Sequence, residues 1–489
     1  MQLVIPGGVN ILQFLRSKGV FIPAYCGGSG VCGKCLVRLM AGTLPVTQED
    51  RFLLSSDKLA QGFRLACKAV TSSPVRIELP EQTLSYQKSE NDNADIDPSH
   101  SFGIAVDIGT TTIAASLVDI TGKTAVRTLT TANSQAAYGA DVITRLSAAQ
   151  ESSAQLQELI RRDISALLSR LCLKDLLVTK MAVAANTAMY HLLLGLDCRG
   201  LTKAPFYTVT LGGQIMLLST LLGDSFDQAF PDISVSLIPG ISAFIGGDIV
   251  SGIASVNADE PFLFADIGTN GEIVLADKDS ILCASAAAGP AFEGGELSCG
   301  MGGIDGAVSR IYDDGGAIKY DIIGSPPAKG LCGSGAADAL AFCVRHGIID
   351  RTGAFDEIHR ESGFVITDGV MLTQDDVRQL QLAKSAIRSC MEVLLKTAGK
   401  GYEDIKTLII AGGFGYFLDL ESAAVTGLIP GELLKYAKAL GNTSLRGAQM
   451  SLYDEGFDKR VSSIIKRAKT LTLTDSEEFK KDFINNLNI

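Results

Sequence analysis

Four cysteines near the N-terminus constrain the fold more than any other feature of the sequence. Three of them stand on one short loop, as Cys26-x5-Cys32-x2-Cys35, and Cys67 follows after 31 further residues. Three thiolates on one loop can hold two irons only where the backbone wraps tightly around the inorganic sulfides. Backbone N–H groups then point at sulfur and tune the redox potential. We therefore predict a 2Fe-2S cluster on this loop, and with it an electron-transfer function.

The glycines of the same loop support this prediction, because they permit the positive φ angles that such wrapping requires. The loop contains Gly27, Gly28, Gly30 and Gly33. The run Gly28-x4-Gly33-Lys34 also resembles a Walker A motif, but Cys35 stands where that motif has the Ser or Thr that binds magnesium. No buried strand precedes the loop either, so we exclude a P-loop.

Zinc is the main alternative to iron and sulfur at these cysteines. Structural zinc sites usually pair their cysteines as two C-x2-C units, whereas Cys67 stands alone. We therefore favour the iron–sulfur interpretation. The other seven of the eleven cysteines form no C-x2-C pair, and we expect them to be small buried residues. They are Cys172, Cys198, Cys283, Cys299, Cys332, Cys343 and Cys390.

Length and composition bound the class of protein. A chain of 489 residues with 46% hydrophobic and 20% charged residues predicts a folded protein of two to four domains. No stretch approaches 18 consecutive apolar residues, and the N-terminus lacks the pattern of a signal peptide. We therefore expect a cytoplasmic protein with no membrane span. Structural disulfides are rare in that compartment, so the cysteines require another explanation.

Charge is spread unevenly along the chain. Residues 1–80 contain nine Lys and Arg against four Asp and Glu, whereas the whole chain has a net charge of −11. This distribution is either scatter or the mark of a basic N-terminal module that docks on an acidic surface of this chain or of a partner. Basic runs are short and the total is acidic, so we expect no nucleic-acid partner.

Patterns along the chain predict three parts. Residues 1–80 contain short strand-like runs around the cysteine loop and form the first domain. Residues 81–101 are polar without apolar periodicity and read as a flexible linker. Residues 102–489 alternate buried strands with helices, as α/β proteins do. The strands are expected at 102–107, 261–266 and 407–411, and the helices at 154–171 and 375–399.

One loop sequence occurs twice in the third part. Asp107-Ile-Gly109-Thr and Asp266-Ile-Gly268-Thr each follow an apolar strand. A repeated loop in a repeated setting predicts two related halves that face each other, the second starting near residue 261. An acid at a strand end followed by Gly and hydroxyl residues suits a nucleotide phosphate with its magnesium.

The candidate nucleotide site follows from these two loops and from a glycine run after the strand at 407–411. We assign the metal to Asp107 and Asp266, as catalytic residues. The phosphate-binding candidates are Gly109, Thr110, Thr111, Thr112, Gly268, Thr269 and Asn270. Backbone at a third loop would lie flat against the purine and ribose. Its glycines are Gly412, Gly413 and Gly415.

Two families resemble parts of the chain. The cysteine spacing resembles the ferredoxin-like domains of the adrenodoxin and putidaredoxin type, which implies an α+β (β-grasp) fold. The strand expected at residues 2–5 looks like the second of that fold, so the usual first strand is missing and a sheet edge is exposed. Whether Met1 is the true start stays open. The three loops, in their order, resemble the acetate kinase, sugar kinase, Hsp70 and actin superfamily, which implies duplicated α/β RNase H-like ATPase domains.

The whole chain resembles the reductive activators of corrinoid proteins. The resemblance includes 138–142, 186–189, 246–248, 286–295, 329–335 and 382–387. It implies an ATP-hydrolysing metalloprotein reductase that passes one electron from the 2Fe-2S cluster to Co(II) cobalamin and regenerates Co(I). It also implies a corrinoid partner from a methyltransferase system, a low-potential electron donor and a homodimer. The individual roles of Asp141, Asp248 and Glu293 stay open.

Two other functions fit the same residues. One is an ATP-dependent activator that injects electrons into a radical dehydratase or reductase. The other is a nucleotide-regulated 2Fe-2S carrier that does not hydrolyse ATP. Dependence of the ATPase on a corrinoid partner would separate these readings.

Overall fold

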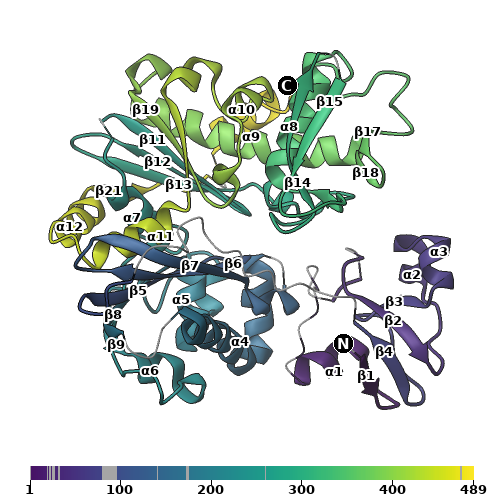
Figure 1. Cartoon of the computed structure of the whole chain (residues 1–489). Helices are drawn as coiled ribbons and strands as arrows, with labels where there is room; N and C mark the ends of the chain where they lie inside the picture. The colour runs from purple at the N-terminus through teal and green to yellow at the C-terminus, as the bar shows by residue number, and fades with distance from the viewer. Residues whose placement is uncertain are drawn as a thin grey trace.

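The computed structural model describes residues 2–18, 20, 22, 24, 28–30, 33–79, 96–139, 141–171, 176–258, 260–315, 317–473 and 476–489. Figure 1 shows a small N-terminal domain beside a larger body, which consists of two halves. No helix in the described part of the chain is both long and apolar enough to span a membrane.

The N-terminal domain is a four-stranded sheet with order β1-β4-β2-β3, packed against one helix. Ile11, Leu12 and Leu15 of α1 lie in one core with Val37 and Ile77 of the sheet. A helix packed against a sheet of this strand order is the predicted ferredoxin-like arrangement. Its elements are β1 (Gln2–Ile5), α1 (Ile11–Ser17), β2 (Leu36–Ala41), α2 (Gln48–Leu53), α3 (Ser56–Ala60), β3 (Phe63–Leu65) and β4 (Val75–Glu78).

The edge of this sheet was predicted to be exposed, and β1 forms that edge. β1 pairs antiparallel with β4 along its whole length, from Gln2 opposite Glu78 to Ile5 opposite Val75. In the described residues β1 has no second neighbour. Val4 on this strand is 63% exposed.

The predicted linker lies mostly outside the described residues, but its last residues belong to the body. Ile96 packs against the core of the first half. The His100 ring contacts Asp119 at 2.7 Å, and β5 begins at Ser101. The body therefore begins before residue 102, because the Ile96 and His100 side chains both contact it.

The first half is a six-stranded sheet of order β7-β6-β5-β8-β10-β9. β5, β6 and β7 form an antiparallel meander, whereas β5, β8 and β10 run parallel. Its elements are β5 (Ser101–Ile108), β6 (Thr112–Asp119), β7 (Thr124–Ala132), η1 (Ser134–Ala137), α4 (Val142–Leu171), β8 (Leu177–Ala185), α5 (Thr187–Leu194), β9 (Ile215–Leu217), α6 (Leu218–Leu222), β10 (Ser234–Leu237) and α7 (Gly247–Ser255).

The second half repeats this plan, with the sheet order β20-β19-β11-β12-β13-β21. Again three strands form a meander, β11-β12-β13, and again the first of them runs parallel to a later buried strand, β19. The predicted duplication is therefore confirmed. The elements are β11 (Phe262–Ile267), β12 (Asn270–Ala276), β13 (Ile281–Ala287), η4 (Pro290–Glu293), α9 (Gln374–Thr397), β19 (Thr407–Ala411), η6 (Phe414–Tyr416), α10 (Leu420–Val425), β20 (Ala437–Gly441), α11 (Thr443–Ser451), α12 (Phe457–Arg467), β21 (Ala468–Thr470) and α13 (Glu477–Asn485).

A smaller lobe is inserted in the second half between η4 and α9 (Figure 1). It contains a three-stranded sheet, a two-stranded sheet and α8, which packs against β14. Its elements are β14 (Ala307–Asp314), β15 (Ala317–Ile322), β16 (Gly330–Leu331), α8 (Gly333–Arg345), β17 (Phe364–Thr367) and β18 (Val370–Leu372).

Helices α7 and α11 join the two halves. They cross closely, because a Cβ on Gly252 would lie 2.8 Å from the Thr443 hydroxyl and one on Gly447 only 2.1 Å from the Ser251 carbonyl oxygen. The Ser251 hydroxyl donates to the carbonyl of Ser444 at 2.7 Å. Small residues at such a crossing allow two backbones to touch, so the halves meet through a closely packed pair of helices.

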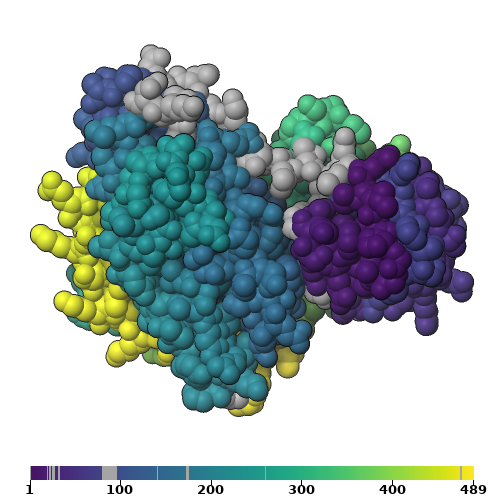
Figure 2. Space-filling model, turned by 90° about the horizontal axis from the view of Figure 1, so that it is seen from below, coloured from purple at the N-terminus to yellow at the C-terminus, as the bar shows by residue number. Residues whose placement is uncertain are grey.

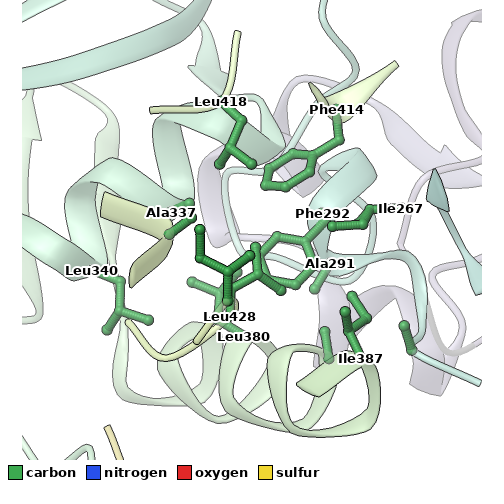
Figure 3. Close-up of a cluster of buried hydrophobic side chains, with 14 of the residues drawn as sticks. Ile267, Ala291, Phe292, Ala337, Leu340, Leu380, Ile387, Phe414, Leu418 and Leu428 are labelled. Carbon is green, nitrogen blue, oxygen red and sulfur yellow. The ribbon is translucent and has the colours of Figure 1, made fainter. Parts of the chain in front are cut away.

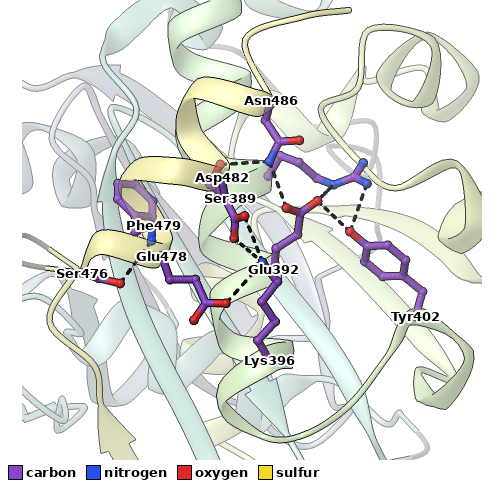
Figure 4. A network of polar contacts seen from close by, with 10 residues as sticks. Ser389, Glu392, Lys396, Tyr402, Ser476, Glu478, Phe479, Asp482 and Asn486 are labelled. Carbon is purple, nitrogen blue, oxygen red and sulfur yellow. Dashed lines mark hydrogen bonds and ion pairs between the residues drawn. The ribbon is translucent and has the colours of Figure 1, made fainter.

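The C-terminal helix α13 is fastened to α9 by a polar network (Figure 4). The Lys396 ammonium donates to both carboxylate oxygens of Asp482, at 2.9 and 2.7 Å. The Asn486 amide donates to Ser389 and to Glu392, which also accepts from Tyr402. α9 lies against β12 and β13, so α13 braces the sheet that bears the second loop.

The N-terminal domain lies beside the first half (Figures 1 and 2), and Arg16 on α1 contacts it. The Arg16 guanidinium on α1 donates to the Ala137 carbonyl and lies 4.7 Å from the centroid of the Tyr138 ring. Between described residues, no ion pair joins this domain to the body. The contacts between described residues therefore include hydrogen bonds and a cation–π interaction.

Candidate functional site

Two of the four predicted cluster cysteines lie in the described residues. Cys35 precedes β2 and Cys67 follows β3, and these strands pair with Leu36 opposite Leu65. The Ala66 amide donates to the Cys35 carbonyl at 2.8 Å, so the paired strands bring both cysteines to the same end of the sheet. Both side chains are at least 90% buried. Cys26 and Cys32 lie outside the described residues.

The glycines of the cysteine loop have the predicted backbone conformation. Gly28, Gly30 and Gly33 have φ angles of 103°, 87° and 68°; Gly27 lies outside the described residues. A Cβ on Gly28 would lie 3.8 Å from the Cβ of Cys67, so the loop packs directly over that cysteine. Soft thiolate ligands beneath a loop of left-handed glycines fit the predicted 2Fe-2S cluster.

The remaining described cysteines are buried or half-buried in the body. Burial raises the pKa of Cys198 to about 11 and of Cys283 and Cys343 to about 12. Such thiols stay protonated and behave as small apolar side chains, as predicted. Cys172 lies outside the described residues.

The first loop is a three-residue turn between β5 and β6. The Gly109 amide donates to the Thr112 carbonyl at 2.9 Å, and a Cβ on Gly109 would lie 2.8 Å from that oxygen. Asn133 supports the turn from η1, because its side-chain amide donates to the Gly109 carbonyl and its backbone amide to the Thr111 carbonyl. Thr112 is already the first residue of β6.

Asp107 at the end of β5 is held by the second half. Its two carboxylate oxygens accept one hydrogen bond each, from the Asn442 amide and the Ser444 hydroxyl, both at 2.7 Å. Both donors lie at the N-terminus of α11, where Asn442 is also the cap. Desolvation raises the pKa of Asp107, and these two hydrogen bonds oppose the shift.

The second loop is tighter and its aspartate is less supported. The Gly268 amide donates to the Asn270 carbonyl at 3.0 Å, and Asn270 is the first residue of β12. Asp266 accepts no hydrogen bond from any described residue. Desolvation and the charges of Asp248, Asp107 and Glu293 raise its pKa to about 8.

Acidic side chains of both halves affect one another here. Desolvation and the charge of Asp107 raise the pKa of Asp248 to about 7, and the pKa of Glu272 is raised well above its usual value by desolvation, Asp248 and Asp266. Facing carboxylates of this kind suit a hard divalent cation. Among the described residues no three of them converge tightly enough to form a complete metal site. Mg²⁺ normally takes one or two carboxylates and fills its shell with water and phosphate, so the residues fit a magnesium–nucleotide complex.

The third loop lies beside the second. β19 runs parallel to β11 with Ala411 opposite Asp266, and a Cβ on Gly412 would lie 2.7 Å from the Asp266 Oδ1. Gly412 has a φ of 91°, which a side chain would disfavour. A Cβ on Gly413 would meet no described atom within 4 Å, whereas one on Gly415 would lie 3.1 Å from the Ile410 carbonyl oxygen. The structure therefore brings together the second and third predicted loops.

Other acids from the sequence motifs have different positions. Asp141 accepts from the Thr144 amide and hydroxyl and caps α4, a structural position. Asp248 lies in the first turn of α7. Glu293 accepts hydrogen bonds from one threonine of each phosphate loop, Thr111 and Thr269.

Sequence reasoning missed three side chains. Asn442 and Ser444 hold Asp107 from 335 and 337 residues away, and no local pattern announces such a contact. Asn133 follows β7 and donates to the first loop, a contact that the sequence likewise does not indicate. The sequence could have indicated only that Asn442 caps a helix.

Family models match the chain in three consecutive stretches. A model for 2Fe-2S iron-sulfur cluster binding domains matches residues 1–72. The RACo middle region matches residues 102–260, and the C-terminal domain of RACo, the ASKHA domain, matches residues 260–489. The chain belongs to the RACo family.

Two curated proteins are similar to this chain over most of its length. The corrinoid activation enzyme RamQ of Eubacterium limosum is 33% identical over 383 residues, which are 72% of this chain and 64% of that protein. The [Co(II) methylated amine-specific corrinoid protein] reductase of Methanosarcina barkeri is 26% identical over 425 residues, 78% of this chain and 76% of that protein. The chain therefore spans a little under two thirds of RamQ.

A solved structure matches nearly the whole RACo chain. It is a reductive activator for corrinoid, iron-sulfur protein, 28% identical with a TM-score of 0.72, covering 99% of this chain and 96% of that one. The fold class and the resemblance predicted from sequence are confirmed. The iron–sulfur domain and the nucleotide-binding fold occur in one polypeptide.

Proposed function

We propose that this chain hydrolyses ATP to drive the transfer of one electron onto the cobalt of a corrinoid protein. Co(II) accepts the electron and becomes Co(I), while ATP and water give ADP and phosphate. The observation that carries the proposal is the pairing of two aspartate loops, joined through α7 and α11, in a chain whose first domain buries Cys35 and Cys67. The names of its relatives support the choice of substrate.

The residues divide into two groups with separate tasks. Cys26, Cys32, Cys35 and Cys67 would hold the 2Fe-2S cluster, which supplies a one-electron carrier when bound. Asp107 and Asp266 would position the Mg²⁺ ion that accompanies ATP. The phosphate oxygens would be bound by the loop amides and hydroxyls, and the purine would lie against the glycines that begin at Gly412.

Nucleotide turnover is needed because the electron moves uphill. A plant-type 2Fe-2S cluster lies at roughly −400 mV, and a gap of about 200 mV to a more negative cobalt couple costs about 5 kcal/mol. Binding can offset this cost only if the chain prefers a conformation of the corrinoid protein that is easier to reduce. Movement of the halves about α7 and α11 would then release the product.

The other expectations about partners stay predictions. They are a low-potential donor that reduces the N-terminal domain, a homodimeric assembly and a cytoplasmic location. A membrane or a nucleic acid is not required by the proposed reaction.

A pull-down with the purified full chain tests this function. We expect a corrinoid protein among the captured proteins and, after reductant and Mg-ATP are added, the visible spectrum of Co(I). Capture of a dehydratase without a corrinoid would favour the radical-activator alternative. Cobalt reduction at the same rate and extent without ATP would favour a simple carrier.

A further inference from the structure

Glu293 bridges the two phosphate loops. Its Oε2 accepts hydrogen bonds from the Thr111 hydroxyl at 2.9 Å and the Thr269 hydroxyl at 2.6 Å. Its Oε1 faces Gly268, where a Cβ would lie only 3.1 Å away. One carboxylate therefore touches the first loop and the second loop together, although the loops belong to different halves.

The segment that carries Glu293 is held firmly. η4 lies between Gly289 and Gly294, whose φ angles are 79° and 76°. A Cβ on Gly294 would lie 2.0 Å from the Met301 carbonyl oxygen, and one on Gly333 would lie 1.8 Å from that of Phe292. The carboxylate is thus presented by a short helix that the surrounding backbone encloses.

The same helix contacts the third loop. The Phe292 ring lies 4.8 Å from the Phe414 ring, centroid to centroid. Figure 3 shows these two rings facing each other, with Ile267 from the end of β11 beside them. η4 therefore touches all three loops of the candidate nucleotide site, through Glu293 and Phe292.

The bridge competes with a nucleotide for the same protons. Each threonine hydroxyl has one proton to donate, and Glu293 takes both. A phosphate oxygen that binds these hydroxyls must displace the carboxylate, since both groups are anionic and accept only. Of the three contacts of Glu293, the one to Thr111 alone crosses from the second half to the first.

We propose that Glu293 is a phosphate-mimicking clasp, which rests on the proposed ATP-binding function. Its carboxylate holds the two phosphate loops together when the terminal phosphate is absent. The terminal phosphate of ATP takes over the Thr111 and Thr269 hydroxyls and displaces Glu293. η4 then passes the change to Phe414 and to the inserted lobe through the N-terminus of α8, which packs against Phe292.

The test is equilibrium binding of AMPPNP and of ADP, each with Mg²⁺, to the full chain. Glu293→Gln removes the charge and Glu293→Ala removes the bridge. Both variants are expected to bind AMPPNP about tenfold more tightly than the wild type, because the competing acceptor is weakened or lost. ADP, which lacks the terminal phosphate, is expected to gain about threefold or less. Glu296→Gln is the matched control, an exposed acid three residues away, and stays within about twofold of wild type for both ligands.

The outcomes separate the clasp from other roles of Glu293. If Glu293 were merely structural, or helped to hold the metal, its substitution would weaken nucleotide binding. Weaker binding by the variants therefore overturns the clasp. Unchanged affinity with hydrolysis reduced about 100-fold would make Glu293 a residue that orients the attacking water, which also overturns it. If neither the wild type nor any variant binds nucleotide, the proposed function falls together with the clasp. If the wild type binds and the variants gain nothing, only the clasp falls.

Discussion

The two aspartate loops have the same sequence, D-I-G-T, and the same place at the end of a central strand, yet their surroundings differ. Asp107 is gripped by Asn442 and Ser444 from the other half of the molecule. Asp266 accepts no hydrogen bond from a described residue, and its pKa is raised to about 8. The two aspartates therefore differ in support: α11 holds the Asp107 carboxylate, whereas that of Asp266 has no hydrogen-bond donor among the described residues. We expect substitutions of the two acids to have different effects on stability.

The largest expected effect on hydrolysis and stability comes from replacing Asp266 and Asp107 with asparagine, one at a time. Asp266→Asn is expected to reduce ATP hydrolysis by about 10²–10³-fold, because a carboxylate that would position the metal is lost. At pH 9, above the pKa of about 8 for Asp266, the same change should raise the melting temperature of the nucleotide-free protein, since it removes a charge that desolvation and Asp248 disfavour. Asp107→Asn should instead lower the melting temperature, because its new amide faces the donor of Asn442. Steady-state hydrolysis and calorimetry measure both; equal shifts in stability would contradict the contrast.

A smaller effect is expected from the donors that hold Asp107. Ser444→Ala removes one charge-assisted hydrogen bond of about 1.5–3 kcal/mol and should reduce hydrolysis about tenfold or somewhat more. Ser451→Ala is the matched control, because that hydroxyl donates to Ala448 within the same helix. If the two alanine variants have the same rate of hydrolysis, α11 does not position Asp107.

The stability of the nucleotide-free protein should depend on pH through the buried acids Asp248 and Asp266. The pKa values of Asp248 and Asp266, about 7 and about 8, lie above the value of 3.8 for an unperturbed aspartate. The folded state then binds more protons than the unfolded state between these limits, so this contribution to stability falls as the pH rises toward 8. Melting temperatures measured from pH 6 to 9 should decline, and Asp266→Asn should flatten the decline. A slope unaffected by this substitution would exclude Asp266 as its source.

The smallest effect on the protein is expected from the contact between the N-terminal domain and the first half, which Arg16 makes. Arg16→Ala removes the hydrogen bonds to Ala137 and the cation–π contact with Tyr138, worth about 1–2 kcal/mol together. Hydrogen exchange in α1 and η1 should become faster while the melting temperature of the body stays unchanged. Arg16→Lys keeps the charge but loses the planar guanidinium, so its exchange rate should lie between those of the wild type and Arg16→Ala. Exchange as slow as in the wild type would show that the contact does not fasten the domain.

Much of the fold was readable from local patterns. Several features depend only on neighbouring residues in the sequence. They are the positions of Cys35 and Cys67, the positive φ angles of the glycines at 28, 30 and 33, and the strand ends at Asp107 and Asp266. The runs at 102–107, 261–266 and 407–411 predicted the central strands, because strands buried on both faces lack alternation.

What could not be read from the sequence depends on contacts between distant residues. Thr112 and Asn270 were predicted in loops but begin strands, since the turns close with three and two residues. Ser444 holds Asp107 from 337 residues away, and Glu293 contacts Thr111 from 182 residues away. Ile96 and His100 looked like linker and belong to the body, because their partners are far along the chain.

The most direct test of the central claim couples the two chemistries in one cuvette. The reduced full chain is mixed with its corrinoid partner in the Co(II) state, and Co(I) absorbance and released phosphate are recorded together. The account predicts that Co(I) accumulates only with Mg-ATP, in proportion to the phosphate released, and that Asp266→Asn gives neither. Full cobalt reduction by Asp266→Asn, or by the wild type without nucleotide, would contradict it.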